Sequence, residues 1–242
     1  MFKYVNNMIK KRANKDTKII NLYSNSKLVA FYNSITNEST FFNDIGFYEK
    51  RINKDQKIVE LASGSGRILK QLIENGYDTI GIELEKMMIE SMEDKYKSFV
   101  VNNNILNVKE LNAIYKETDI FILPATTISL FSIEEIIKFL VDLKKINKNF
   151  KLIFDLLSLD KIINKKPKKV VNELGTFYYI NFISGGQVVY NLFDKDTNIV
   201  GVSRKQNHSL NDILVQLKEL EFNVYYTKIS EDYYMIEGSY NE

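Results

Sequence analysis

The chain has 242 residues, of which 45% are hydrophobic, enough to close one sizeable core. It has 33 lysine and arginine residues against 31 aspartate and glutamate residues, so the formal net charge is +2. Such an even balance disfavours broad attraction to nucleic acids or membranes. Because there is no cysteine, disulfides, zinc–thiolate sites and thiol nucleophiles are excluded.

The N-terminal segment lacks the apolar run of a signal peptide, and no stretch is long and apolar enough to span a bilayer. We therefore expect no membrane span and a cytoplasmic location. Two basic runs, residues 10–12 and 165–169, are interpreted as solvated surface, with a contact to a phosphate group or an acidic peptide as the alternative. No feature of the sequence indicates an oligomeric state.

Residues 1–50 have a helical, polar and aromatic character with no strand-like run. From Lys57 onward, short apolar runs alternate with helical patterns, which is typical of βαβ units and a parallel sheet. The predicted strands cover 58–61, 79–84, 99–101, 120–123 and 152–157. The predicted helices cover 67–75, 85–96, 110–115 and 133–146, the last with Ser132 as its N-cap.

After residue 158 this alternation stops. Residues 170–205 have the pattern of antiparallel hairpins, with turn signals at 185–186 and 194–198. A helix is predicted over 209–221, and an antiparallel pair over 224–229 and 233–238. These elements predict an α/β fold with a Rossmann-like seven-stranded sheet, parallel except for its last strand. We expect helices on both faces and an antiparallel insertion after the fifth strand.

The segment 57–72 carries the strongest functional signal. A buried strand ends at Leu61, and Gly64 and Gly66 then permit a tight turn and close approach of the backbone to a ligand. A helix begins near Arg67, so its free N–H groups face that ligand. Glu60 lies at the end of the strand, where a carboxylate can meet an ammonium group.

A second acid, Glu83, ends the next strand, 17 residues after Gly66. Dinucleotide-binding folds place an acid at about this distance to accept hydrogen bonds from ribose hydroxyls. A dinucleotide and an adenosyl sulfonium are both compatible with this pattern. The position of the third glycine of a dinucleotide loop is occupied here by Leu69, and Glu60 would repel a pyrophosphate. These two residues favour the sulfonium ligand.

The stretches V-E-L-A-S-G-S-G-R and G-I-E-L-E-K-M-M-I resemble the first two motifs of the class I S-adenosylmethionine-dependent methyltransferases. The resemblance covers residues 30–240, most firmly 57–131, and implies S-adenosylmethionine as cofactor. It places the methionine part beside Glu60, Gly64 and Gly66, the ribose on Glu83, and the adenine near Leu84 and Met88. Further cofactor contacts are expected from Ala62, where the family usually has glycine, Asn104, where it often has an acid, and Ser65, Arg67, Ile105, Pro124 and Ala125.

The loop L-P-A-T-T-I-S-L-F, residues 123–131, resembles the family's loop beside the reactive methyl group. It lacks the Asn or Asp, two prolines and aromatic residue of enzymes that methylate nucleobase amines, so no nucleic-acid acceptor is expected. Thr126 and Thr127 are candidate acceptor-binding residues, with capping of the loop or of the next helix as the alternative.

The stretch A-F-Y-N, residues 30–33, resembles an element of small-molecule methyltransferases whose tyrosine closes over the cofactor. Tyr32 is therefore a candidate catalytic lid residue, with core packing as the alternative. His208, the only histidine, is a candidate base, with a surface or N-cap role as the alternative. Tyr178, Tyr179 and Tyr190 are candidates for an acceptor wall around a cationic transition state, or are plain packing residues. No acid cluster indicates a metal site.

The resemblance implies one methyltransferase domain over residues 1–242. It consists of an N-terminal helical lid (1–50), a cofactor-binding core (51–160), an antiparallel acceptor-side insertion (161–207) and a closing helix and strands (208–242). The expected reaction is methyl transfer to an amine nitrogen of a small metabolite or peptide terminus. Methylation of a hydroxyl group and a non-catalytic S-adenosylmethionine-binding regulator or partner subunit are the alternatives.

Overall fold

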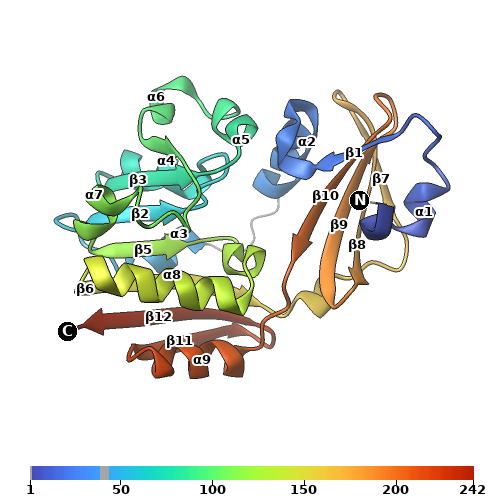
Figure 1. Cartoon of the computed structure of the whole chain (residues 1–242). Coiled ribbons are helices and arrows are strands. Elements are labelled where there is room, and N and C mark those ends of the chain that lie inside the picture. The colour runs from blue at the N-terminus through green and yellow to red at the C-terminus, as the bar shows by residue number, and fades with distance from the viewer. Residues whose placement is uncertain (1, 39–43) are drawn as a thin grey trace. The chain divides into compact units, whose positions relative to one another are not determined.

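The computed structural model describes residues 2–38 and 44–242, so residues 39–43 of the predicted lid lie outside the described part. The chain divides into two compact units, whose elements Figure 1 labels. The core unit comprises Thr40–Ser158 and His208–Glu242. The insertion unit comprises Met1–Ser39 and Leu159–Asn207.

The core unit contains a seven-stranded sheet in the order β11-β12-β6-β5-β2-β3-β4. Strands β2 to β6 are mutually parallel, and β12 is antiparallel to both β6 and β11, which confirms the predicted sheet with its antiparallel last strand. The strands are β2 (Lys57–Leu61), β3 (Asp78–Glu83), β4 (Val100–Asn102), β5 (Ile120–Leu123), β6 (Asn149–Leu157), β11 (Asn223–Ser230) and β12 (Tyr233–Asn241).

Helices cover both faces of this sheet, as predicted (Figure 1). Alternate strand residues face α7, α8 and α9 on one side, and α3 and α4 on the other, because successive side chains of a strand point to opposite faces. The helices are α3 (Asp44–Glu49), α4 (Arg67–Glu74), α5 (Lys86–Glu90), α6 (Asp94–Lys97), α7 (Asn112–Lys116), the 3₁₀ helix η3 (Thr127–Leu130), α8 (Ile133–Ile146) and α9 (Leu210–Glu219).

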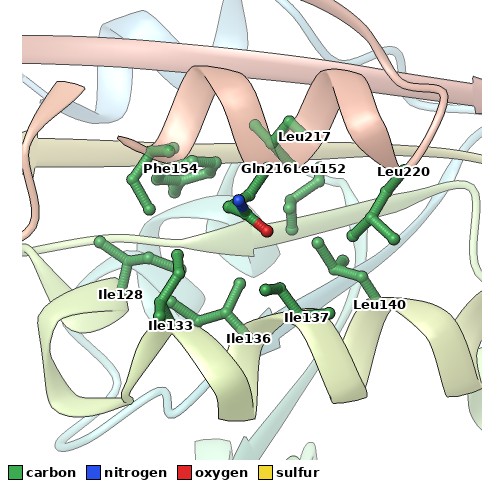
Figure 2. Close-up of a pocket in the computed structure, with 11 residues that line it drawn as sticks. Ile128, Ile133, Ile136, Ile137, Leu140, Leu152, Phe154, Gln216, Leu217 and Leu220 are labelled. Carbon is green, nitrogen blue, oxygen red and sulfur yellow. The ribbon is translucent and has the colours of Figure 1, made fainter. Parts of the chain in front are cut away.

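A small hollow lies between α8 and α9 over strand β6. Figure 2 shows that the amide of Gln216 is surrounded there by isoleucine, leucine and phenylalanine side chains. Its lining includes Ile136, Leu140, Leu152 and Leu217, which belong to the hydrophobic core on this face. Because Gln216 is the one polar residue of this lining among the described residues, we interpret the hollow as imperfect packing of the core and not as a ligand site.

The insertion unit is built on a five-stranded sheet in the order β1-β10-β9-β8-β7. Strands β7 to β10 pair antiparallel, which confirms the predicted hairpins. The elements are η1 (Phe2–Tyr4), α1 (Asn7–Lys10), β1 (Lys18–Asn21), η2 (Leu22–Ser24), α2 (Ser26–Glu38), η4 (Leu159–Ile162), β7 (Lys168–Asn172), β8 (Gly175–Ser184), β9 (Gln187–Asp194) and β10 (Ile199–Lys205).

Two expectations about local structure are wrong. Residues 1–50 do contain a strand, β1, which pairs parallel with the distant β10. Its two isoleucines, Ile19 and Ile20, pack on opposite faces of the sheet, and so short a run gives no local signal of a strand. The predicted helix 85–96 is two helices, because Ser91 ends α5 and Glu93 has an extended backbone before α6.

No helix in the described part of the chain has the length and apolarity needed to cross a membrane.

Ser132 has the predicted role of N-cap. Its hydroxyl accepts from the Glu135 N–H, and the Glu135 carboxylate accepts from the Ser132 N–H, which makes a capping box for α8. We expect Ser132→Ala to lower the free energy of unfolding by about 1 kcal/mol, measured by urea denaturation. Ser98→Ala, at an exposed C-cap, is the control. Equal stability of the two variants would contradict the role of the box.

Candidate active site at the carboxyl ends of the strands

The turn after β2 has the backbone geometry that the sequence predicted for a ligand loop. Ala62, Gly64 and Gly66 have φ values of 53°, 58° and 78°, all in the left-handed region. Gly66 is the N-cap of α4 and makes no side-chain cap, so the first amides of this helix need other partners. A non-glycine residue is strained in this conformation, which accounts for the glycine usual at the position of Ala62.

Methionine side chains also pack closely against the two glycines of the turn. An added Cβ atom on Gly64 would lie 3.2 Å from Cε of Met88, and one on Gly66 would lie 3.2 Å from Sδ of Met92. Met88 is buried, whereas Leu84 is 55% exposed at the end of β3. Ser65 lies half-buried between the two glycines. The predicted residues of the two motifs are therefore brought together.

Glu83 connects the two motifs directly. Its Oε2 accepts from the Gly64 N–H at 2.7 Å, and its Oε1 accepts from the Glu85 N–H at 2.7 Å. Burial raises the pKa of Glu83, while the Glu85 and Gly64 amides act in the opposite direction. Each carboxylate oxygen can accept a second hydrogen bond, so Glu83 is oriented and still able to accept from two hydroxyl groups.

Glu60 has a different environment. It is 3% exposed, and its Oε2 has no hydrogen-bond partner among the described residues. Burial raises the pKa of Glu60 to about 8, although Arg67 and the Leu69 amide favour the charged form. Glu60 is therefore mostly protonated at neutral pH in the free protein. A cation placed beside it would favour ionisation.

Arg67, a predicted cofactor contact, is held by an acid that the sequence analysis missed. Its Nη1 donates to Oδ1 of Asp44 at 2.8 Å and its Nη2 donates to Oδ2, a bidentate pair. Asp44 is buried at the start of α3, 23 residues before Arg67. No local pattern marks Asp44, since its role depends on a contact between distant segments.

Asn104 and Ile105 lie after β4, in the position that the resemblance assigned to the adenine. Oδ1 of Asn104 accepts from the Leu106 N–H at 2.9 Å, and Ile105 is part of the core. The neighbouring Asn102 was not predicted. Its Nδ2 donates to the carbonyl oxygens of Glu83 and Leu84 at 2.8 and 2.9 Å, so it fixes the backbone of Glu83 and of the residue that follows it.

The loop after β5 is strained. Ala125 and Thr126 both have φ of 59°, which is costly for a β-branched residue such as threonine. Oδ2 of the buried Asp155 accepts from the Thr126 N–H at 2.8 Å. The Thr127 hydroxyl donates to the carbonyl oxygen of the buried Pro124. Asp155, at the end of β6, is thus a structural anchor of the loop that sequence spacing did not reveal.

His208 lies in the core unit just before α9. Its Nε2 is 2.8 Å from the carbonyl oxygen of Phe131, so this nitrogen donates and Nδ1 is the nitrogen left to accept a proton. Phe131 directly follows the β5 loop and η3.

The tyrosine candidates lie in the insertion unit, where the sheet separates them. Tyr32 and Tyr190 pack in one hydrophobic cluster, on the face covered by α2. Tyr178 points to the opposite face, under Arg12, whose guanidinium carbon is 5.0 Å from the ring centroid. The structure therefore groups Tyr32 with Tyr190 and Tyr179, and not with Tyr178.

The environment of Glu60 predicts a pH-dependent stability. In the unfolded chain this carboxyl ionises near pH 4.5, whereas in the folded protein it ionises near pH 8. Burial of Glu60 therefore costs stability increasingly as the pH rises from 4.5 to 8, and the cost is complete above 8. We expect Glu60→Gln to raise the Tm by about 3–5 °C at pH ~9 and by little at pH ~5. A Tm difference that is independent of pH, or equal to that of the exposed-site control Glu90→Gln, would contradict this assignment.

No protein-family model and no curated protein matches this sequence. Solved structures do match it. A S-adenosylmethionine-dependent methyltransferase from Clostridium acetobutylicum ATCC 824 is 15% identical over 89% of this chain and 98% of that chain, with a TM-score of 0.69. The sugar N-methyltransferase KedS8 from Streptoalloteichus sp ATCC 53650 is 15% identical over 87% and 93% of the two chains, with a TM-score of 0.66.

The glycopeptide N-methyltransferase MtfA, complexed with S-adenosyl-L-homocysteine, is 10% identical over 81% of this chain and 88% of its own, with a TM-score of 0.56. At sequence identities of 10–15%, the similarity to these structures is a similarity of fold. Together with the strand order and the turn after β2, it establishes that the chain has the class I S-adenosylmethionine-dependent methyltransferase fold.

Proposed function

We propose that this chain binds S-adenosylmethionine and transfers its methyl group to an amine nitrogen of a small metabolite or peptide terminus. The observation that carries the proposal is the position of Glu83, whose carboxylate is oriented by the amides of Gly64 and Glu85. A carboxylate fixed at the end of the second parallel strand is suited to two neighbouring ribose hydroxyls.

Glu60 supports the choice of this cofactor over a dinucleotide. A buried acid, one of whose oxygens has no partner among residues 2–38 and 44–242, disfavours a pyrophosphate and favours the ammonium of a methionine group. Leu69, at the position of a dinucleotide loop's third glycine, is fully buried in the helix that follows the turn. Ala62, Gly64 and Gly66 have left-handed backbones, which lets the turn after β2 approach a ligand closely.

Bound S-adenosylmethionine supplies a methyl group already activated by its sulfonium, so the protein mainly has to position the acceptor and exclude water. The strained loop at Ala125 and Thr126 is the candidate acceptor-positioning element, held in place by Asp155. His208 would take a proton from the acceptor at Nδ1, because its Nε2 donates to Phe131. Tyr32 remains the candidate lid residue.

An amine acceptor is favoured because, among the described residues, the candidate site offers no base beyond the imidazole of His208, and an amine needs little more than loss of its proton. KedS8 and MtfA, which share this fold, are described as sugar and glycopeptide N-methyltransferases. Both descriptions fit a small-molecule or peptide acceptor.

Glu83→Ala should weaken S-adenosylmethionine binding by about 1–3 kcal/mol, since the ribose hydroxyls and the turn amide both lose an acceptor. Calorimetric titration of the full chain measures this change. Glu90→Ala, an exposed acid on α5 that pairs only loosely with Lys86, should leave the affinity unchanged. Unchanged affinity in folded Glu83→Ala, or binding of NAD in place of S-adenosylmethionine, would overturn the cofactor assignment.

The acceptor class can be tested with methyl-labelled S-adenosylmethionine and two metabolite pools, one of amines and the other of hydroxylated compounds without amines. We expect label to enter the amine pool, with mass spectrometry showing one added methyl group on nitrogen. Label confined to the hydroxylated pool would identify an O-methyltransferase. Tight cofactor binding without transfer to either pool would favour the regulator.

A further inference from the structure

The near-neutral charge of the whole chain hides a strong division between its two units. The insertion unit has 15 lysine and arginine residues against 6 aspartate and glutamate residues, a formal net charge of +9. The core unit has 18 against 25, a formal net charge of −7. A net charge of +9 creates a positive electrostatic potential, which raises the local concentration of anions around the insertion unit and lowers that of cations.

One face of the insertion unit's sheet carries a group of hydroxyl-bearing side chains. Tyr23, Tyr32, Tyr179 and Tyr190, here called the tyrosine patch, belong to one cluster on the face covered by α2. They come from η2, α2, β8 and β9, so two helical and two sheet elements that are distant in sequence supply the patch. Ser203, opposite Tyr190 in the β9–β10 register, continues this face.

The contacts within the tyrosine patch form a continuous row. The Ser203 hydroxyl lies 3.5 Å from that of Tyr23, and the Tyr23 and Tyr32 rings meet edge to face with centroids 5.5 Å apart. The Tyr179 and Tyr190 ring centroids are 6.0 Å apart. Because burial raises the pKa of both Tyr23 and Tyr190, these phenols stay protonated and act as hydrogen-bond donors.

Tyr190 supplies an independent sign of a ligand. Its hydroxyl is buried and has no hydrogen-bond partner among the described residues. Buried hydroxyl groups are nearly always paired, and an unpaired one calls for a bound water, ion or ligand group. The missing partner of a neutral phenol donor is an acceptor atom.

The ammonium group of Lys168 borders the tyrosine patch. Lys168 on β7 is opposite Tyr179 in the β7–β8 register, and its Nζ is 5.8 Å from the Tyr179 ring centroid. Its neighbour Lys169 is opposite Tyr178 and therefore points to the other face. Both lysines are exposed, so they differ chiefly in the face that they occupy.

We propose that the tyrosine patch, with Lys168 at its edge, binds an oxyanion, a carboxylate or a phosphate group. Phenol donors and an ammonium group in a strongly basic unit are suited to bind an anion. The same positive charge disfavours a cationic group, for which the sequence had suggested a wall of tyrosines. The binding of an oxyanion is independent of the proposed function. The further step, that this oxyanion is part of the methyl acceptor, rests on the proposed function.

The test is calorimetric titration of the full chain, at constant ionic strength, with inorganic pyrophosphate, succinate and tetramethylammonium. We expect one or both anions to bind and the cation not to bind; which anion binds more tightly distinguishes a phosphate from a carboxylate ligand. Tyr190→Phe and Lys168→Gln should each weaken anion binding by about tenfold, the effect of losing one hydrogen bond to a charged group.

The controls lie on the opposite face of the same sheet. Tyr178→Phe removes a hydroxyl from β8, and Lys169→Gln removes the same charge as Lys168→Gln; both should leave anion affinity nearly unchanged. Equal losses in the two lysine variants would show diffuse charge attraction, and equal losses in the two tyrosine variants would show an effect that is not specific to this face. Either result would overturn the proposal, as would binding of tetramethylammonium or of no anion at millimolar concentrations. S-adenosylmethionine binding, titrated in parallel, separates failure of this proposal from failure of the proposed function.

Discussion

The carboxylate of Glu83 is the group on which the candidate cofactor site depends. It accepts from the turn after β2 through Gly64 and from the start of the segment after β3 through Glu85, so it joins two motifs that are separate in the sequence. The turn itself contains three left-handed residues, one of them an alanine, and such a backbone persists only where surrounding bonds determine it. Packing of Met88 and Met92 against the glycines, and the bonds of Asn102 to the backbone beside Glu83, complete that support.

Two buried glutamates at neighbouring strand ends acquire different chemistry from their surroundings. Glu83 has an amide donor on each oxygen. Glu60 has an oxygen with no hydrogen-bond partner in the described part of the chain, and burial raises its pKa to about 8. The first is suited to accept from neutral hydroxyl groups, and the second to meet a cation. The insertion unit has the opposite character, with a net charge of +9 and neutral phenol donors. The core unit therefore offers a group suited to a cation, and the insertion unit offers groups suited to an anion.

The sequence predicted those features that have a local cause. Apolar periodicity predicted the parallel strands and α8, and the two glycines predicted the turn after β2. Ser132 was predicted as the N-cap of α8. Features that depend on contacts between distant segments were not predictable in this way. The strand β1 exists because two isoleucines pair with β10, and Asp44 and Asp155 matter because Arg67 and Thr126 lie beside them in space. The alternation of Tyr178 and Tyr179 on β8 similarly required the register of the sheet. The charge balance of the whole chain did not reveal that the two units have opposite net charges, because it sums over both.

The most direct test of the central claim is a crystal structure of the chain grown with S-adenosylhomocysteine, the demethylated cofactor. Glu83 is predicted to accept from both ribose hydroxyls, with the ammonium of the amino acid end beside Glu60 and the adenine against Met88. Density for the nucleoside away from the turn after β2, or its ribose bound without Glu83, would contradict the assignment of this site.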